Sequence, residues 1–99
     1  MGPGRSAIKV AVADDQPIYR MGVAKLLEPE GDLALVGEAA NGQEAILVVE
    51  RFDPDVLLLD LRMPVMDGIE VLSELAKRKL RARVILMMSN ADRDRKSVV

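Results

Sequence analysis

The sequence predicts an α/β domain built on a parallel β-sheet with helices on both faces. Short apolar runs alternate with segments of helical periodicity, in the order strand, helix, strand, helix, strand, helix, strand. Each right-handed crossover between parallel strands packs its helix back onto the sheet, which produces this layered arrangement. The chain has 99 residues, enough for one domain of this kind and too few for a second independent core.

Local signals place the individual elements. The strands are expected at residues 7–13, 33–37, 55–59 and 83–88. The helices are expected at residues 18–28, at residues 42–52 with Asn41 as N-cap, and at residues 67–79 with Asp67 as cap, and a further helix is expected to start near Ala91. Asn41 and Gly42 also fit a hairpin turn, but Glu44 three residues after Asn41 completes a capping-box pattern and favours the helix.

Composition narrows the chemistry that this chain can perform. It contains no cysteine and no histidine, which excludes thiolate catalysis, disulfides, an imidazole base and the usual zinc sites. The formal net charge of −2 provides no positive field, so we expect no direct binding to nucleic acid or to an anionic membrane. The longest apolar runs are far shorter than the roughly 20 residues that cross a bilayer. A cytoplasmic location is compatible with these features and is the one we expect.

Aspartates follow two of the predicted strands. Asp14 and Asp15 come after the first strand, and Asp60 ends the third. Ligands of open parallel sheets bind beyond the carboxyl ends of the strands, and three carboxylates gathered there repel one another unless a cation joins them. Hard oxygen ligands favour Mg²⁺, which commonly binds through carboxylates together with phosphate oxygens. The alternative is that these aspartates only cap helices or begin turns.

The segments around these aspartates have a distinctive sequence. They read VADDQP at residues 12–17 and LLLDLRMPVMDG at residues 57–68. Together they resemble the receiver domain of bacterial two-component response regulators. The segments DQPIYRMG at 15–22, GEAANG at 37–42 and DPD at 53–55 resemble in particular receivers that precede a DNA-binding output domain of the LuxR/FixJ (NarL-like) type. The similarity covers residues 7–99, and the output domain itself would lie outside this chain.

The resemblance implies a flavodoxin-like (CheY-like) doubly wound sheet with the strand order 2-1-3-4. It implies that Asp60 accepts a phosphoryl group from the phosphohistidine of a sensor histidine kinase. It also implies that Asp14, Asp15, Asp60 and the backbone carbonyl of Arg62 hold Mg²⁺. Ser89, at the end of the fourth predicted strand, matches the switch hydroxyl of the family, although capping of the next helix fits the local sequence as well. Such a domain is a signalling phosphoprotein and not a turnover enzyme.

The end of the sequence departs from the family pattern. A full receiver has a fifth parallel strand and helix and a lysine after that strand, and none of these can be assigned. We therefore expect residues 7–99 to form a receiver that is incomplete at its C-terminus, and residues 1–6 to be an expression leader. The fourth strand would then be an uncovered edge, which predicts a homo-oligomer formed by edge pairing or by exchange of elements between copies.

Two other functions fit parts of the pattern. The first is a receiver-like module that binds partners or dimerises without being phosphorylated, because the family's lysine is missing. The second is a small Mg²⁺-dependent phosphatase with Asp60 as nucleophile. This second function normally requires an acid two residues after the nucleophile, where this chain has Arg62.

Overall fold

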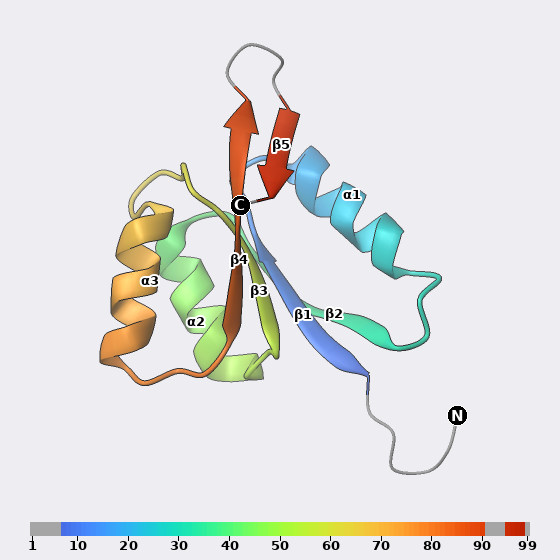
Figure 1. Ribbon diagram of the computed structural model, residues 1–99, viewed down its shortest axis with the longest axis horizontal. Helices are drawn as coiled ribbons and strands as arrows, with labels where there is room; N and C mark the ends of the chain where they lie inside the picture. The colour runs from blue at the N-terminus through green and yellow to red at the C-terminus, as the bar shows by residue number, and fades with distance from the viewer. Residues whose placement is uncertain (1–6, 91–94, 99) are drawn as a thin grey trace.

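The computed structural model describes residues 7–90 and 95–98, and its elements follow the predicted order (Figure 1). The strands are β1 (Ile8–Ala13), β2 (Leu33–Ala39), β3 (Val56–Asp60), β4 (Arg83–Asn90) and β5 (Arg95–Val98). The helices are α1 (Pro17–Leu27), α2 (Gly42–Phe52) and α3 (Gly68–Lys77). The first four strands and the three helices are those predicted, with ends that differ by a few residues. Within the described residues, no helix has the length and apolar character that a membrane span requires.

The sheet has the order β2-β1-β3-β4-β5, and its first four strands are parallel. This confirms the doubly wound class and the predicted order 2-1-3-4. Helices α2 and α3 lie on one face of the sheet and α1 lies on the other (Figure 1). The chain runs outward from β1 to β2 and then crosses back to β3, so the strand order reverses between β1 and β3. Ligands of such sheets bind at the carboxyl ends of the strands at this reversal.

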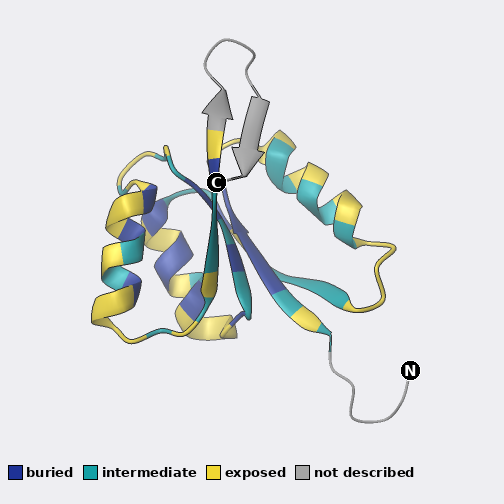
Figure 2. Ribbon diagram, viewed as in Figure 1, coloured by how far each residue is buried: buried dark blue, intermediate teal, exposed yellow. Residues whose placement is uncertain are grey.

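The main hydrophobic core lies between the sheet and helices α2 and α3. Leu57 and Leu59 of β3 and Val71 of α3 are each 0% exposed, and Val49 of α2 packs in the same cluster (Figure 2). Small residues of β1 that point to this face, such as Ala11, let α2 approach the sheet closely. Because Leu59 directly precedes Asp60, this core also fixes the point at which β3 ends.

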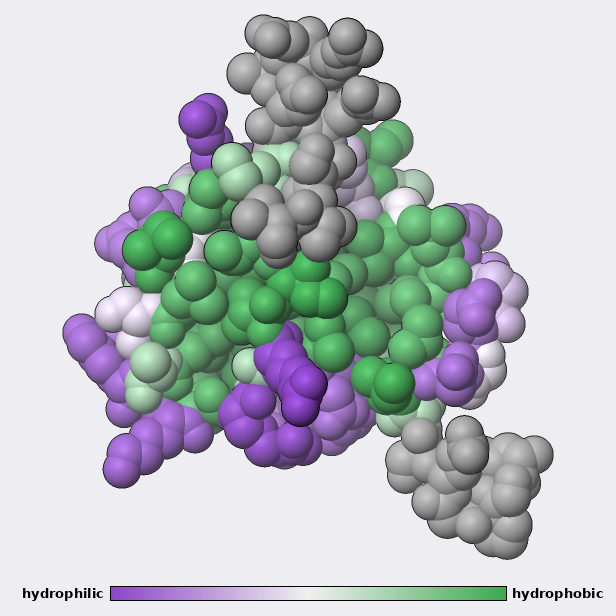
Figure 3. Space-filling view, viewed as in Figure 1, coloured by the Kyte–Doolittle hydropathy of each residue, from purple (hydrophilic) through white to green (hydrophobic). Residues whose placement is uncertain are grey.

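The opposite face of the sheet is less covered. No residue of α1 is fully buried, and Ile18, Met21 and Leu26 of this helix are 71%, 64% and 74% exposed. Leu58 of β3 and Ile85 of β4 are only half-buried. Figure 3, viewed with β4 toward the reader, shows a broad apolar area that extends to both sides of this strand. The sheet is therefore covered more completely by α2 and α3 on one face than by α1 on the other.

The last strand corrects one expectation about the end of the chain. Residues 91–94, where the helix near Ala91 was expected to begin, lie outside the described residues, but Arg95–Val98 form a strand and not a helix. This additional strand, β5, pairs antiparallel with residues 87–90 of β4, so it is not the parallel fifth strand of a full receiver, which the described residues lack as expected. Only four residues separate the two strands, too few for the crossover that a parallel strand requires.

The β4 edge is consequently only half covered. β5 pairs with β4 from Met87 to Asn90, whereas the first half of β4 pairs with β3 alone among the described residues. An unpaired edge presents backbone N–H and C=O groups that another chain can bind. The predicted exposed edge is therefore shorter than expected and limited to residues 83–86.

Candidate functional site

The three aspartates predicted from the sequence meet at one end of the sheet. Asp14 directly follows β1, and Asp60 is the last residue of β3. Ala13 pairs with Leu59 in the parallel ladder, so the two aspartates occupy equivalent positions on neighbouring strands. Carboxylate oxygens of Asp14, Asp15 and Asp60 all lie within 4.8 Å of one another.

Burial of two of the three carboxylates raises the electrostatic cost of this cluster. Asp14 is 0% exposed and Asp60 is 1% exposed, whereas Asp15 is exposed to solvent. Ionised carboxylates that are buried close together repel one another strongly, because little water separates them. The oxygen ligands, the short separations and the opening at Asp15 fit a small hard cation such as Mg²⁺, which keeps some of its own water.

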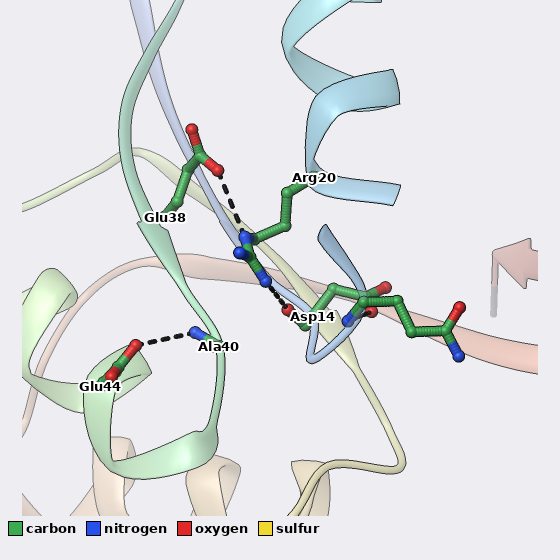
Figure 4. A network of polar contacts seen from close by, with 6 residues as sticks. Asp14, Arg20, Glu38, Ala40 and Glu44 are labelled. Carbon is green, nitrogen blue, oxygen red and sulfur yellow. Dashed lines mark hydrogen bonds and ion pairs between the residues drawn. The ribbon is translucent and has the colours of Figure 1, made fainter. Parts of the chain in front are cut away.

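Asp14 is held in place by hydrogen bonds from three directions. Its backbone N–H donates to the carbonyl of Ala39 at 3.0 Å, which extends the pairing of β1 with β2. Its carboxylate Oδ1 accepts from the backbone N–H of Gln16 at 2.9 Å. Its carbonyl oxygen accepts from Nη1 of Arg20 on α1 at 2.7 Å (Figure 4). These bonds fix both the main chain and the side chain of Asp14.

Asp60 is held by the end of β3 and by the loop that follows. Its Oδ1 accepts from the backbone N–H of Arg62 at 3.2 Å. The N–H of Leu61 donates to the carbonyl of Met87 on β4 at 2.9 Å, and the N–H of Gly68 donates to the carbonyl of Leu61 at 2.8 Å. A Cβ on Gly68 would lie 2.9 Å from the Leu61 Cα, so a glycine is needed where α3 begins against this loop.

Asp67 caps helix α3 and is not part of the carboxylate cluster. Its side chain accepts from the N–H of Glu70 at 2.9 Å, and the Glu70 carboxylate accepts from the N–H of Asp67 at 3.1 Å. This capping box confirms the role predicted for Asp67. Helix α2 likewise starts at Asn41, whose side chain accepts from the N–H of Glu44 at 2.9 Å, so the helix is confirmed in place of the hairpin.

Sequence reasoning missed two residues that support the site. One is Gly42, because a Cβ there would clash with the carbonyl oxygen and the Cβ of Met66 in the loop between β3 and α3. The other is Arg20, which contacts the carbonyl of Asp14. The only sequence signals were a glycine directly after the N-cap Asn41 and an arginine in the first turn of the helix that follows the two aspartates.

Two predicted site residues keep roles that the structure does not test. Ser89 lies in β4, two residues beyond Met87, which pairs with Asp60, but its side chain is outside the described part of the structure. Arg62 lies next to the cluster through its N–H, whereas the role predicted for its carbonyl concerns a bound ion. Both roles stay predictions, as do the phosphoacceptor role of Asp60 and the metal-ligand roles of the three aspartates.

Comparison with known proteins agrees with this architecture. The family model for the response regulator receiver domain matches residues 10–99. The nitrate/nitrite response regulator protein NarL of Escherichia coli (strain K12) is 41% identical over 86 residues, which are 86% of this chain and 40% of that protein. A protein-glutamate methylesterase/protein-glutamine glutaminase of Pseudoalteromonas atlantica is 44% identical over 73 residues, 74% of this chain but 19% of the relative. The chain thus spans about two fifths or less of the length of these relatives.

Solved structures with the same fold are receiver domains or contain one. The signal receiver domain of Mycobacterium tuberculosis NarL has a TM-score of 0.81 and 39% identity, and the match covers 86% of this chain and 68% of that chain. A DNA-binding response regulator of the LuxR family from Staphylococcus aureus has a TM-score of 0.76 and 32% identity, with 84% and 69% covered.

Proposed function

This chain belongs to the response regulator receiver family, and we propose that its Asp60 accepts a phosphoryl group from the phosphohistidine of a sensor histidine kinase. The observation that carries this proposal is the meeting of Asp14, Asp15 and Asp60, whose carboxylate oxygens lie within 4.8 Å of one another. Asp60 suits the role of acceptor because it is the last residue of the central strand β3. The preceding residue, Leu59, is 0% exposed, so the packed core holds the backbone of Asp60 in place.

The chemistry of the transfer is within reach of a carboxylate. An ionised carboxylate attacks phosphorus without help from a base. One oxygen of Asp60 forms the new P–O bond while the P–N bond to the kinase imidazole breaks, and the departing nitrogen takes up a proton from solvent. Such a transfer depends mainly on positioning and on neutralisation of the developing charge. The N–H of Arg62, 3.2 Å from Asp60 Oδ1, contributes to the positioning.

We further propose Mg²⁺ as the cofactor, held by the carboxylates of Asp14, Asp15 and Asp60 and by the backbone carbonyl of Arg62. The bound ion supplies positive charge that offsets the negative charge of the phosphoryl oxygens. Exposure of Asp15 leaves one side of the cluster open to water, which suits an ion that dehydrates reluctantly. The Ser89 hydroxyl is the proposed donor to a phosphoryl oxygen after transfer.

The proposed output is transcriptional control. Relatives of this chain include a DNA-binding response regulator of the LuxR family, and we propose that phosphorylation here controls a DNA-binding domain in the full-length protein. The chain itself has a net charge of −2 and is not proposed to bind nucleic acid. It is not proposed as a turnover enzyme, since the methylesterase relative is matched over only 19% of its length.

Self-association is part of the proposal. Residues 83–86 of β4 offer an unpaired strand edge among the described residues, and the apolar face beside α1 adjoins it. A second copy can cover this region by pairing edge to edge or by exchanging an element. Light scattering on the 99-residue chain at micromolar concentration is expected to give a mass above that of a monomer. A folded chain that remains monomeric at that concentration would contradict this part of the proposal.

The phosphorylation proposal is tested by intact-mass measurement after incubation with Mg²⁺ and a small phosphodonor. The unsubstituted chain is expected to gain the mass of one phosphoryl group, and Asp60→Asn is expected to gain none. Asp55→Asn is the matched control, because Asp55 adjoins the other end of the same strand, outside the carboxylate cluster. A phosphoryl adduct that persists in Asp60→Asn would sink the assignment of this residue.

The same experiment decides the alternative function. The exposed side chains of Ile18, Met21 and Leu26 on α1 favour an interaction module that acts without phosphorylation. A folded chain that shows neither a mass increase nor hydrolysis of the donor would support this alternative. Donor hydrolysis without a stable adduct would instead point to the phosphatase.

A further inference from the structure

We propose that Arg20 is a positioning residue for the metal site. Its guanidinium holds the turn that carries Asp14 and Asp15, and in this way it sets the direction in which both carboxylates face. The inference rests on the proposed function, because it assumes that these carboxylates bind Mg²⁺.

Arg20 binds the turn through both its side chain and its backbone. Its Nη1 donates to the carbonyl of Asp14 at 2.7 Å, and its own backbone N–H donates to the carbonyl of Gln16 at 3.4 Å. Figure 4 shows the guanidinium of Arg20 reaching from α1 to the end of β1, with Glu38 of β2 on its other side. Two hydrogen bonds from Arg20 of α1 therefore hold the turn between β1 and α1.

The bond to the Asp14 carbonyl controls a peptide plane that both aspartates share. The peptide group between Asp14 and Asp15 is planar, so the direction of its carbonyl determines where the chain enters Asp15. Asp14 is 0% exposed, and a buried carbonyl needs a donor from the protein. A guanidinium donor makes a shorter and stronger hydrogen bond than a neutral group. Loss of Arg20 would allow this peptide to rotate and would misplace both carboxylates.

Glu38 makes this arrangement compatible with a cation site. A guanidinium beside Mg²⁺ would repel the ion, but the Nε of Arg20 lies 3.3 Å from Oε1 of Glu38, and this ion pair offsets its charge. The side chain of Arg20 is 19% exposed and that of Glu38 is 47% exposed, so the pair is only partly screened by water. Positioning and repulsion therefore predict opposite effects of removing Arg20: lost positioning weakens Mg²⁺ binding, and lost repulsion strengthens it.

The test is the dissociation constant for Mg²⁺ of the whole 99-residue chain, measured by titration calorimetry and repeated with Mn²⁺ by electron paramagnetic resonance. Arg20→Met is expected to weaken binding by about tenfold, the low end of the loss seen when a residue that orients a metal ligand is removed. Arg20→Lys, which keeps one charged donor, is expected to recover part of the loss. Arg78→Met is the matched control, because Arg78 is likewise paired with glutamate but is the C-cap of α3, outside the cluster.

A second measurement follows the turn without any metal. The N–H of Gln16 donates to Asp14 Oδ1, and its hydrogen exchange is expected to accelerate in Arg20→Met and to stay unchanged in Arg78→Met. Circular dichroism checks that each variant is folded. If Arg20→Met does not fold, Arg20→Lys replaces it and is expected to bind Mg²⁺ more weakly than the unsubstituted chain.

Two results would overturn the inference in distinguishable ways. If the unsubstituted chain binds Mg²⁺ and folded Arg20→Met binds it equally well or more tightly, the positioning role is wrong while the proposed function survives. Equal affinity in Arg20→Lys has the same meaning where Arg20→Met is unfolded. If the folded, unsubstituted chain binds neither Mg²⁺ nor Mn²⁺, the proposed function fails and the inference fails with it.

Discussion

The two ends of the parallel sheet both carry aspartates, but these aspartates have very different surroundings. At the carboxyl end, Asp14, Asp15 and Asp60 place their carboxylates within 4.8 Å of one another. At the amino end, Asp55 directly precedes β3, and its Oδ2 accepts from the backbone N–H of Lys9 at 2.8 Å. At the carboxyl end three negatively charged side chains lie together, and at the amino end the carboxylate of Asp55 accepts a hydrogen bond from a backbone N–H.

Asp55 joins the starts of three strands. Its N–H donates to the carbonyl of Lys9 on β1 at 2.8 Å, and its carbonyl accepts from the N–H of Arg83 on β4 at 3.0 Å. The pKa of the Asp55 carboxyl is lowered, mainly by the hydrogen bond from the N–H of Lys9 and further by the positive charges of Arg81 and Lys9. This carboxylate stabilises the fold, and its oxygens are occupied by the bonds to Lys9 and Arg81.

The comparison separates a structural aspartate from a candidate functional one. Asp55 and Asp60 adjoin opposite ends of the same strand, so neither residue type nor burial of the strand distinguishes them. They differ in burial and in partners: Asp60 is buried with two other carboxylates within 4.8 Å, whereas Asp55 is half-buried and shares the cation of Arg81 with Asp53. Like charges that a fold holds together lower its stability, and a cation that binds them recovers that free energy. We therefore expect the proposed Mg²⁺ binding at the carboxyl end to be coupled to stability.

The largest expected effect is a change of stability with Mg²⁺. At a free concentration of about 100 times the dissociation constant, Mg²⁺ is expected to raise the free energy of unfolding by about 2.7 kcal/mol. Asp15→Asn is expected to lose most of this gain and to be more stable than the unsubstituted chain without metal, by about 1 kcal/mol, because one repelling charge is removed. Urea unfolding with and without Mg²⁺ measures both quantities.

Asp55→Asn provides the contrast, because it should leave the Mg²⁺ effect in place while lowering stability in both conditions. An Asp15→Asn variant that is less stable than the unsubstituted chain without metal would argue against repulsion within the cluster.

A smaller effect is expected from crowding the loop that follows β3. Gly42→Ala is expected to lower the free energy of unfolding by about 1–3 kcal/mol, because the new Cβ meets backbone and side-chain atoms of Met66. Gly22→Ala on the exposed side of α1 is the matched control. A Cβ there would meet no atom within 4 Å apart from its chain neighbours and the nearby backbone of its own helix, and the change is expected to raise stability by about 0.5–1 kcal/mol. Equal stability of the two variants in thermal unfolding would show that the Gly42 contact relaxes freely.

The smallest effect concerns pH and the amino end. Because the pKa of Asp55 in the folded chain lies below its ordinary value of 3.8, the folded state binds this proton less readily than the unfolded state does. The stabilisation is therefore fully present above the ordinary pKa and is lost as the pH falls through the lowered one. Asp55→Asn is expected to reduce the loss of stability on acidification below about pH 4. Thermal unfolding at several pH values across that range measures this loss.

Arg81→Gln refines this pH test. The N–H of Lys9 is the main cause of the lowered pKa of Asp55 and the charge of Arg81 is a lesser one, so this variant should keep most of the acid dependence. An acid dependence that disappears in Arg81→Gln would instead assign the effect to the ion pair.

Much of the fold and the central part of the site were predictable from local patterns. The alternation of apolar runs and helical periodicity predicted seven of the elements, and Asp67 was correctly identified as a cap because capping bonds join residues three positions apart. The meeting of Asp14, Asp15 and Asp60 was predicted on the condition that the first and third strands are neighbours, since the carboxyl ends of neighbouring parallel strands lie on one side. The strand order itself came from the family resemblance.

Other features were decided only when distant segments came together. The bond from Arg20 to the Asp14 carbonyl, the approach of Gly42 to Met66, the antiparallel strand β5 and the less covered face beside α1 left no periodic signal in the sequence. Periodicity records which side of an element is apolar, but it does not record which atoms of another element will lie there. Those contacts depend on the separation and angle of packed elements, which exist only in the folded chain.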